Sequence, residues 1–296
     1  MTSGSEAGDG SNASSRARAG HVSVFRTGQR SPQVSITLDQ RTGREVFHSN
    51  MALARFNPGR VWESLTEITP DPQFLDGNGL FSNPSTSPAT ATFDILRTRV
   101  LQTIAKQKWS RIAITSPTHG CGKSFVAANL ALSMARLPSC RTVLLDLELR
   151  DPQLARLFGQ SDVGALAEFL QGEQPLESQL RRLGANLALG LNGAPVSQAS
   201  ELLHGPDFPQ AMSNLRELLE PDLILIDTPP ALGSDDVLAL AAEVDAAILV
   251  VDGKLTTAED VRACERLFDG RLPLLGTVLN RAQDRATERY AYGQRN

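Results

Sequence analysis

One nine-residue segment, residues 116–124, combines glycines, a lysine and a hydroxyl in an order that suits phosphate binding. It reads SPTHGCGKS and meets the pattern G-x-x-x-x-G-K-[ST] except at its first position, where Pro117 replaces glycine. In such a loop, successive backbone N–H groups and the start of the following helix form an anion nest. We expect Lys123 to reach the β- and γ-phosphates of ATP, and the Ser124 hydroxyl to hold Mg²⁺.

The lysine content of the chain singles out this loop. The chain has four lysines, Lys106, Lys108, Lys123 and Lys254. Arg supplies the rest of its positive charge. Lys carries a compact charge on a flexible stem, which Arg cannot mimic in a tight phosphate cradle. The alternative, a glycine-rich turn with an incidental lysine, is disfavoured by the strand and helix that flank the loop. The residues expected to contact the nucleotide here are Thr118, His119, Gly120, Cys121, Gly122, Lys123, Ser124 and Phe125.

Two further segments place carboxylates directly after aliphatic runs. TVLLD ends in Asp146 and continues to Glu148, and LILID ends in Asp227. Asp146 and Glu148 alternate, so they share one face while the chain stays extended. Because Mg²⁺ prefers oxygen ligands, and a strand-end Asp is the usual magnesium partner of a phosphate loop, we expect the metal at Ser124, Asp146 and Asp227. An acid at a strand end can instead cap the next helix. This alternative stays open for Asp151, Asp235 and Asp236.

Buried strands and helices alternate from about residue 92 onwards. Strands are expected at 111–115, 142–146, 187–191, 223–227, 246–251 and 274–279. Helices are expected at 125–137, 152–158, 163–171, 208–219, 237–242 and 257–268, and the spacing at 93–104 is also helical. Continuous aliphatic strands separated by helices predict a mostly parallel sheet covered on both faces, a three-layer α/β fold of the P-loop NTPase type. Ligands bind at the carboxyl ends of such strands, where the loop and the acids fall.

The composition divides the chain into three parts. Residues 1–88 are rich in Ser, Gly, Arg, Pro and Asn without a sustained period, which predicts a largely disordered N-terminal arm. Within it, a transient strand is expected at 34–38 and a short helix at 51–62. Residues 89–283 form the expected ATP-binding domain, and residues 284–296 a flexible polar tail.

Charge, cysteines and hydropathy disfavour several classes of protein. The net charge of −4 argues against a nucleic-acid partner. The three cysteines are widely spaced with no CxxC, so neither a zinc site nor a disulfide framework is expected. No run of about 18 apolar residues occurs, and the N-terminus lacks the apolar stretch of a signal peptide. We therefore expect a cytoplasmic protein that meets a membrane only through a partner.

Three segments resemble the nucleotide motifs of the bacterial tyrosine kinases: SPTHGCGKSFVAANLA, VLLDLELRDPQLARLFG and LILIDTPPALGSDD. These are the CpsD/CapB-type kinases of capsule and exopolysaccharide synthesis, a branch of the MinD/ParA-like ATPase superfamily. The resemblance covers residues 88–283. It implies that Lys123 and Ser124 bind phosphates and Mg²⁺, that Asp146 orients or deprotonates the acceptor hydroxyl, and that Asp227 supports the metal. Arg150 follows in the same motif.

The resemblance extends to both flanks of the domain. Asn280 matches the position that typically touches adenine in the superfamily. Tyr290 and Tyr292, the only tyrosines in the chain, fall where the family has its autophosphorylated cluster, so they are the expected phosphoacceptors. Thr118 stands where the MinD and ParA branches carry an extra lysine, which favours the kinase branch.

Two positions depart from the family pattern. Glu148 replaces the second Asp of the family's Asp-x-Asp. The ring-forming motif Glu-x-x-Arg-x-x-Arg of the helix before the first strand reads Ala91, Asp94 and Arg97 here, so only its last position matches. A homo-oligomeric ring therefore stays an open question.

The resemblance implies an autophosphorylating ATP:protein tyrosine kinase that regulates polymerisation and export of an exopolysaccharide or capsule. Its catalytic residues would be Lys123, Asp146, Glu148 and Arg150. A transmembrane polysaccharide co-polymerase would activate it and recruit it to the inner face of the plasma membrane. Two alternatives stay open: a MinD/ParA-like ATPase switch without kinase activity, and a weakly catalytic ATP-binding scaffold.

Overall fold

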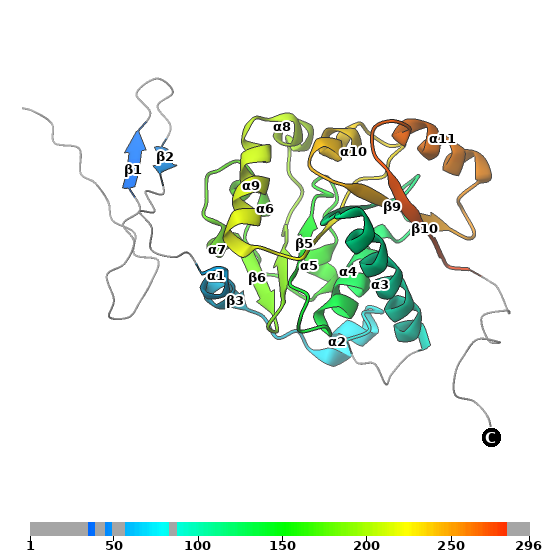
Figure 1. Ribbon diagram of the computed structural model, residues 1–296, viewed down its shortest axis with the longest axis horizontal. Coiled ribbons are helices and arrows are strands. Elements are labelled where there is room, and N and C mark those ends of the chain that lie inside the picture. Colours follow the sequence, from blue (N-terminus) through cyan, green and yellow to red (C-terminus); the bar gives the residue numbers. More distant parts are fainter. Residues whose placement is uncertain (1–34, 39–44, 49–56, 83–87, 283–296) are drawn as a thin grey trace, which may run out of the picture. The chain divides into compact units, whose positions relative to one another are not determined.

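The computed structural model describes residues 35–38, 45–48, 57–82 and 88–282, which belong to two units, Met1–Phe56 and Asn57–Asn296 (Figure 1). In the first unit, β1 (Ser35–Leu38) pairs with β2 (Glu45–His48) in an antiparallel hairpin. The strand β1 falls within the range 34–38 in which the sequence predicts a strand. Among the described residues, no helix is both long and apolar enough to cross a bilayer.

The second unit is built on one eight-stranded sheet with the order β10-β9-β4-β8-β5-β7-β6-β3. All neighbours in this sheet are parallel except β6 and β7. The strands are β3 (Thr66–Glu67), β4 (Arg111–Thr115), β5 (Thr142–Asp146), β6 (Leu180–Leu183), β7 (Leu187–Gly190), β8 (Leu223–Asp227), β9 (Ala246–Asp252) and β10 (Leu274–Asn280). The mostly parallel sheet that the aliphatic runs predict is confirmed.

Helices cover both faces of this sheet. On one face, α4 (Lys123–Ala135) packs on the central strands β4, β8, β5 and β7, and α3 (Pro88–Gln107) packs on α4. On the other face, Gly190 of β7 lies against Leu166 of α6 (Leu166–Leu170). The helices α9 (Asp207–Leu219), α8 (Ala199–His204) and α10 (Asp236–Ala239) continue that layer, each packed on the one before. The remaining helices are α5 (Leu154–Leu157), α7 (Leu176–Gln179), the 3₁₀ turn η1 (Leu240–Ala242) and α11 (Ala258–Phe268).

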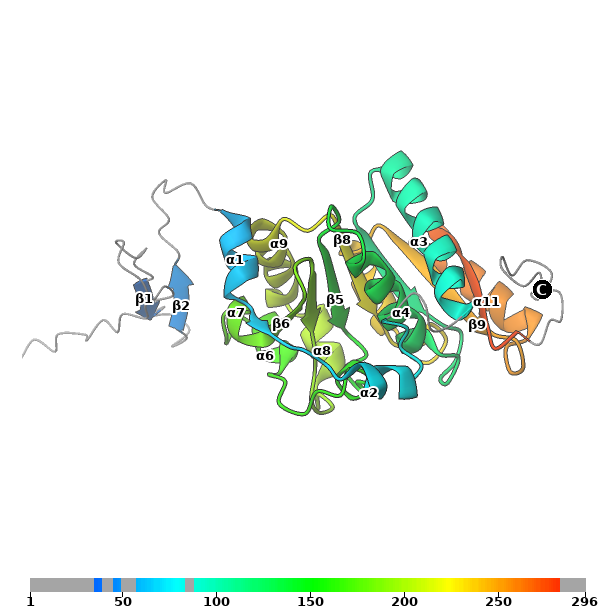
Figure 2. The same ribbon diagram turned by 90° about the horizontal axis from the view of Figure 1, so that it is seen from below.

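Residues 57–82 correct the prediction of a disordered arm that reaches residue 88. This segment forms α1 (Pro58–Ser64), β3 and α2 (Pro72–Gly77), and five of its apolar side chains are buried in the second unit: Val61, Trp62, Leu65, Leu75 and Leu80. Trp62 is 2% exposed, its indole nitrogen donates to the Leu219 carbonyl at 2.7 Å, and α1 lies beside α9 (Figure 2). The elements are short and carry isolated apolar residues, so they lack the periodicity that marks longer helices.

The start of α1 has a local cause. Pro58 occupies the first turn and the Asn57 side chain accepts a hydrogen bond from Gly59 N. Pro is favoured in a first turn because its fixed φ suits the helix and its missing N–H has no partner there. The helix predicted at 51–62 therefore begins only at residue 58 within the described part, and residues 51–56 lie outside it.

The strand β6 was not predicted. Its sequence, LRRL, interrupts the apolar run with two arginines, so it lacks the continuous aliphatic pattern of the central strands. It turns back through Gly184, whose φ of +64° suits glycine, and pairs antiparallel with β7. β3 then adds to its outer edge.

Candidate nucleotide site

The segment after β4 has the conformation of an anion nest. Gly120 and Gly122 have φ values of +80° and +90°, which only glycine adopts without strain. No side chain caps α4, which begins at Lys123 directly after Gly122. The N–H groups of Cys121 and Gly122 have no backbone partner among the described residues. These donors, together with the start of a thirteen-residue helix, suit a phosphate group.

The loop is attached to the segment after β8. Ala231 N donates to the Ser116 carbonyl at 2.7 Å, and Leu232 N donates to the Pro117 carbonyl at 3.2 Å. The Thr115 hydroxyl donates to the Pro229 carbonyl at 2.8 Å. Pro117, which replaces the first glycine of the pattern, therefore contributes a carbonyl that joins the phosphate loop to the segment after β8.

Lys123 points into a cluster of carboxylates. Its Nζ lies 2.8 Å from Glu148 Oε2, and the two side chains are 11% and 1% exposed. Apart from this ion pair, neither Glu148 oxygen has a partner in the described part of the chain. Burial alone lowers the pKa of Lys123, but the neighbouring carboxylates of Asp227, Glu148 and Asp146 raise it overall. The lysine therefore stays charged.

Asp146 and Asp227 lie side by side. They are register partners at the ends of the parallel strands β5 and β8, and both are fully buried. Burial raises the pKa of Asp227 to about 6, although Lys123 and the Ser124 hydroxyl oppose the shift. Burial and the charge of Asp227 raise the pKa of Asp146 well above its ordinary value. Two acids held together in this way favour an added cation.

Several of these carboxylate oxygens lack hydrogen-bond partners. Asp146 Oδ1 and both oxygens of Asp227 have none among the described residues. Asp146 Oδ2 instead accepts from Leu154 N, the first residue of α5, at 3.1 Å. Asp146 thus uses one oxygen to cap the next helix, and its other oxygen remains available for the metal, a role that stays a prediction.

Arg150 is directed to a different partner. Its Nε lies 2.9 Å from Asp236 Oδ2, and a second nitrogen lies 3.3 Å from Oδ1. Asp236 is fully buried and also accepts from the Ser234 hydroxyl at 3.0 Å. Arg150 and Asp236 therefore join the segment after β5 to the segment after β8. The structure does not bring Arg150 into the cluster around Lys123.

The other loop residues that are expected to contact the nucleotide differ in exposure and direction. The Thr118 hydroxyl lies 3.6 Å from Cys121 Sγ, and Cys121 is buried, whereas His119 is exposed. The ring of Phe125 turns away from the loop and packs edge-on against Phe81 and Phe93. For Phe125, therefore, only the backbone N–H in the first turn of α4 can serve a nucleotide.

Asn280 lies beside the loop. Its Nδ2 donates to the Cys121 carbonyl at 2.9 Å, and its Oδ1 accepts from Arg281 N at 2.9 Å. Arg281, which the sequence argument missed, donates to the Gly120 carbonyl at 2.9 Å and pairs with Asp252 at 2.5 Å. Arg281 directly follows the carboxyl end of β10, the part of a parallel strand where ligands bind. That position in the sequence could have identified it.

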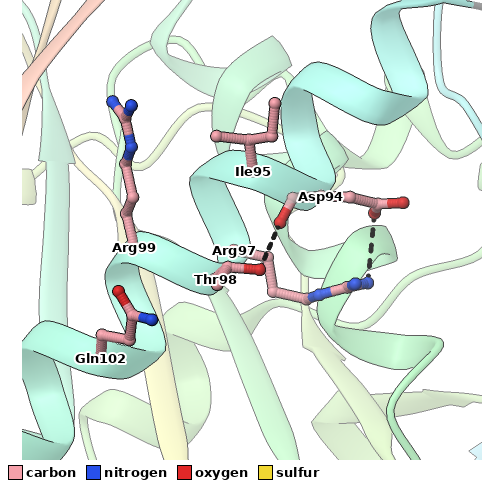
Figure 3. Close-up of a pocket in the computed structure, with 6 residues that line it drawn as sticks. All are labelled: Asp94, Ile95, Arg97, Thr98, Arg99 and Gln102. Atoms are coloured by element: carbon pink, nitrogen blue, oxygen red, sulfur yellow. Dashed lines mark hydrogen bonds and ion pairs between the residues drawn. The ribbon is translucent and has the colours of Figure 1, made fainter. Parts of the chain in front are cut away.

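The expected phosphoacceptors Tyr290 and Tyr292 lie outside the described residues. The degenerate ring motif lies on α3, where Asp94 pairs with Arg97 (Figure 3). Asp94 also pairs with Arg136 and accepts from the Ser133 hydroxyl. Arg97 also donates to the Ser133 carbonyl at 2.8 Å. The one matching arginine of the motif is thus bound within its own chain. A surface pocket on this helix is lined by Asp94, Ile95, Arg97, Thr98, Arg99 and Gln102.

Comparisons with known proteins identify the family. Residues 108–288 match the ParA family of P-loop NTPases, described as "NUBPL iron-transfer P-loop NTPase". The solved kinase domain of VpsO is 32% identical, with a TM-score of 0.58, and the match covers 66% of this chain and 97% of that domain. The chain belongs to the bacterial tyrosine kinase family, within the ParA-like P-loop NTPases.

Two curated relatives from this family show the extent of the match. The putative tyrosine-protein kinase EpsB of Ralstonia nicotianae is 32% identical over 210 residues, which are 70% of this chain and 27% of EpsB. The tyrosine-protein kinase Etk of Escherichia coli K12 is 28% identical over 216 residues, which are 71% of this chain and 29% of Etk. The present chain therefore spans less than a third of the length of EpsB or Etk.

Proposed function

We propose that this chain is an ATP-dependent protein-tyrosine kinase that phosphorylates tyrosines of its own kind. The observation that carries this proposal is the convergence of Lys123 with two strand-end aspartates beside a glycine loop. A tyrosine hydroxyl and a γ-phosphate require positioning and charge neutralisation more than covalent chemistry, and this site offers both. The match to the VpsO kinase domain over nearly its whole length supports the same reaction.

The residues present fit a magnesium ion. Asp146 Oδ1 and both Asp227 oxygens are buried with no hydrogen-bond partner in the described part of the chain, and the Ser124 hydroxyl lies close enough to Asp227 to affect its pKa. Mg²⁺ usually takes one or two carboxylates and completes its shell with phosphate oxygens and water, so two strand-end aspartates beside a phosphate loop are sufficient protein ligands. Such an ion would neutralise charge on the phosphates.

The chain's own groups would act as follows. Lys123 and the loop N–H groups would bind the β- and γ-phosphates, and Lys123 would exchange its ion pair with Glu148 for one with phosphate. The phenol oxygen of tyrosine would bond to the γ-phosphorus as the bond from phosphorus to the bridging oxygen of ADP breaks. Asp146 Oδ1 would accept the phenol proton, and Asp227 with the Ser124 hydroxyl would then hold the ion.

The proposed acceptors are Tyr290 and Tyr292, in the segment that follows the last strand. The proposed process is the polymerisation and export of an exopolysaccharide or capsule, at the inner face of the plasma membrane. A transmembrane polysaccharide co-polymerase is the proposed activator. The relation to EpsB and the resemblance to capsule kinases support both statements, and co-purification from membranes of the native host tests them.

Phosphosite mapping tests the kinase proposal. Purified protein is incubated with Mg·ATP, with and without the membrane partner, and its phosphopeptides are identified by mass spectrometry. We expect phosphate on Tyr290 or Tyr292 that is absent in Lys123→Met and present in the matched control Lys106→Met, which alters an exposed lysine of α3. ATP hydrolysis without phosphotyrosine would instead establish the ATPase switch, and ATP binding with neither product would establish the scaffold.

A further inference from the structure

Two consecutive residues after the last strand hold two consecutive carbonyls of the phosphate loop. Asn280 Nδ2 donates to the Cys121 carbonyl and Arg281 donates to the Gly120 carbonyl, both at 2.9 Å. A Cβ at position 122 would clash with Asn280 Nδ2, so Gly122 is required by this contact as well as by its φ of +90°. The contact is therefore a close one that the loop is shaped to allow.

The geometry of the peptide bond gives these contacts a consequence. In a planar trans peptide, the C=O of one residue and the N–H of the next point in opposite directions. The carbonyls of Gly120 and Cys121 share their peptide planes with the N–H groups of Cys121 and Gly122. Those two N–H groups have no backbone partner among the described residues and belong to the anion nest. A donor that holds each carbonyl outward therefore turns each N–H inward.

Arg281 is itself held in place. It pairs with Asp252 Oδ2 at 2.5 Å, and the other oxygen of Asp252 accepts from Lys254 N at 2.7 Å and Leu255 N at 3.2 Å. Asp252 and Asn280 are register partners on β9 and β10. The Asp252 side chain is fully buried, whereas that of Arg281 is 49% exposed. The ends of two neighbouring strands thus fix the guanidinium against the loop.

We propose that Asn280, Arg281 and Asp252 form a clamp that positions the phosphate-binding N–H groups, so that Asn280 serves the loop as well as any contact with adenine. The proposal rests on the proposed nucleotide binding and names the positioning residues of that site. A charged donor on a carbonyl also polarises the N–H of the same peptide, which strengthens its hydrogen bond to an anion.

Binding of ATP compared with Mg·tripolyphosphate separates the two roles of Asn280, because tripolyphosphate has no base. Isothermal titration of Asn280→Ala and Arg281→Ala should show the affinity for both ligands weakened, about tenfold for the charged donor of Arg281 and about threefold for the neutral amide of Asn280. Arg281→Lys, which keeps a donor and a charge, should recover most of the affinity. Loss of ATP affinity in Asn280→Ala with tripolyphosphate affinity unchanged would overturn the role of Asn280 in the clamp and leave an adenine contact as its role.

A matched control removes an ion-paired arginine elsewhere. Arg266→Ala breaks a 2.6 Å pair with Glu259 on α11 and should leave both affinities unchanged. NMR order parameters of the Cys121 and Gly122 amides in the nucleotide-free protein give a readout that needs no ligand. We expect them to fall from about 0.85 to below about 0.6 in Arg281→Ala and in Asn280→Ala, and to stay unchanged in Arg266→Ala. Unchanged order parameters would overturn the clamp. Failure of the wild-type protein to bind either ligand would overturn the proposed function and leave this readout valid.

Discussion

Lys123 Nζ lies 2.8 Å from Glu148 Oε2, and both side chains are almost fully buried. In the proposed site, a nucleotide would therefore replace Glu148 as the partner of this lysine. Glu148→Gln removes the charge with little change in shape, and we expect ATP affinity in the absence of metal to rise by about 3- to 10-fold. Calorimetric titration in EDTA measures this, with the exposed Glu63→Gln as the control. A weaker affinity in Glu148→Gln would contradict this and show that the glutamate holds Lys123 in the position that binds phosphate.

Asp227 should destabilise the metal-free protein. Both of its oxygens are buried, and neither has a hydrogen-bond partner of good geometry within the described segments, although the Ser124 hydroxyl lies near; such a group costs about 1–3 kcal/mol. The amide of Asn can donate to the neighbouring Asp146, so Asp227→Asn should raise the free energy of unfolding by about 1–2 kcal/mol. For a domain of this size each kcal/mol raises Tm by about 2–4 °C. Thermal unfolding of the metal-free variant measures the effect, and a lower Tm than the wild type would contradict it.

The carboxylate of Asp227 should also make the free energy of unfolding depend on pH. The pKa of Asp227 is raised to about 6 in the folded protein, against about 3.9 in an unfolded chain. Between these values the folded state binds the additional proton, so stability falls as pH rises from about 4 to about 6. In metal-free buffer, Asp227→Asn should flatten this part of the profile of unfolding free energy against pH. A wild-type profile that rises across the same interval would be inconsistent with the shift.

Magnesium binding should show the opposite dependence on pH. A metal ligand must be deprotonated, so affinity for Mg·ATP should increase as pH rises through about 6. Titrations at pH 5, 6 and 7 should show this increase in the wild type and little of it in Asp227→Asn. Tripolyphosphate without metal provides the reference, because the lysine that it meets stays charged over the whole interval.

Arg150 should stabilise the fold through Asp236. The guanidinium of Arg150 holds the pKa of this buried carboxylate low against the opposing effect of burial. Because the arginine is half exposed, its removal in Arg150→Ala should cost about 1–2 kcal/mol rather than the full cost of a buried pair. The loss should be present at pH 7 and disappear as Asp236 becomes protonated below about pH 4. Urea unfolding at both pH values measures it, with the exposed Arg156→Ala as the control.

Trp62 should anchor residues 57–82, which precede the predicted ATP-binding domain, to the rest of the second unit. Trp62→Phe removes the bond to the Leu219 carbonyl and should cost about 1 kcal/mol, whereas Trp62→Ala should cost about 3–5 kcal/mol. Guanidinium unfolding measures both. Equal stabilities of the three proteins would show that residues 57–82 do not contribute to the cooperative unit.

The central strands and the glycine loop could be predicted from sequence because each has a strong local signal. The strands Arg111–Thr115, Thr142–Asp146 and Leu223–Asp227 end where the aliphatic runs end. The carboxyl ends of parallel strands meet at one edge, so the closeness of Asp146 and Asp227 follows from the same pattern. The roles assigned to these residues stay predictions.

Other contacts depend on tertiary partners that no local pattern reveals. The pairing of Arg150 with Asp236 joins residues 86 positions apart, and that of Arg281 with Gly120 joins residues 161 positions apart. Trp62 is one aromatic residue in a polar stretch, and its burial depends on α9. The direction of the Phe125 ring likewise follows from Phe81, which lies in the segment predicted to be disordered.

The two-residue strand β3 has a consequence for any shortened version of this protein. It covers the outer edge of β6, and Glu67 of β3 pairs with Arg182 of β6 at 2.9 Å. An uncovered strand edge is a template on which another copy can add its own strand, and short charged edge strands prevent this. A truncation that starts at residue 88, at the beginning of α3, would open that edge. Such a fragment should aggregate at concentrations at which the longer chain stays dispersed.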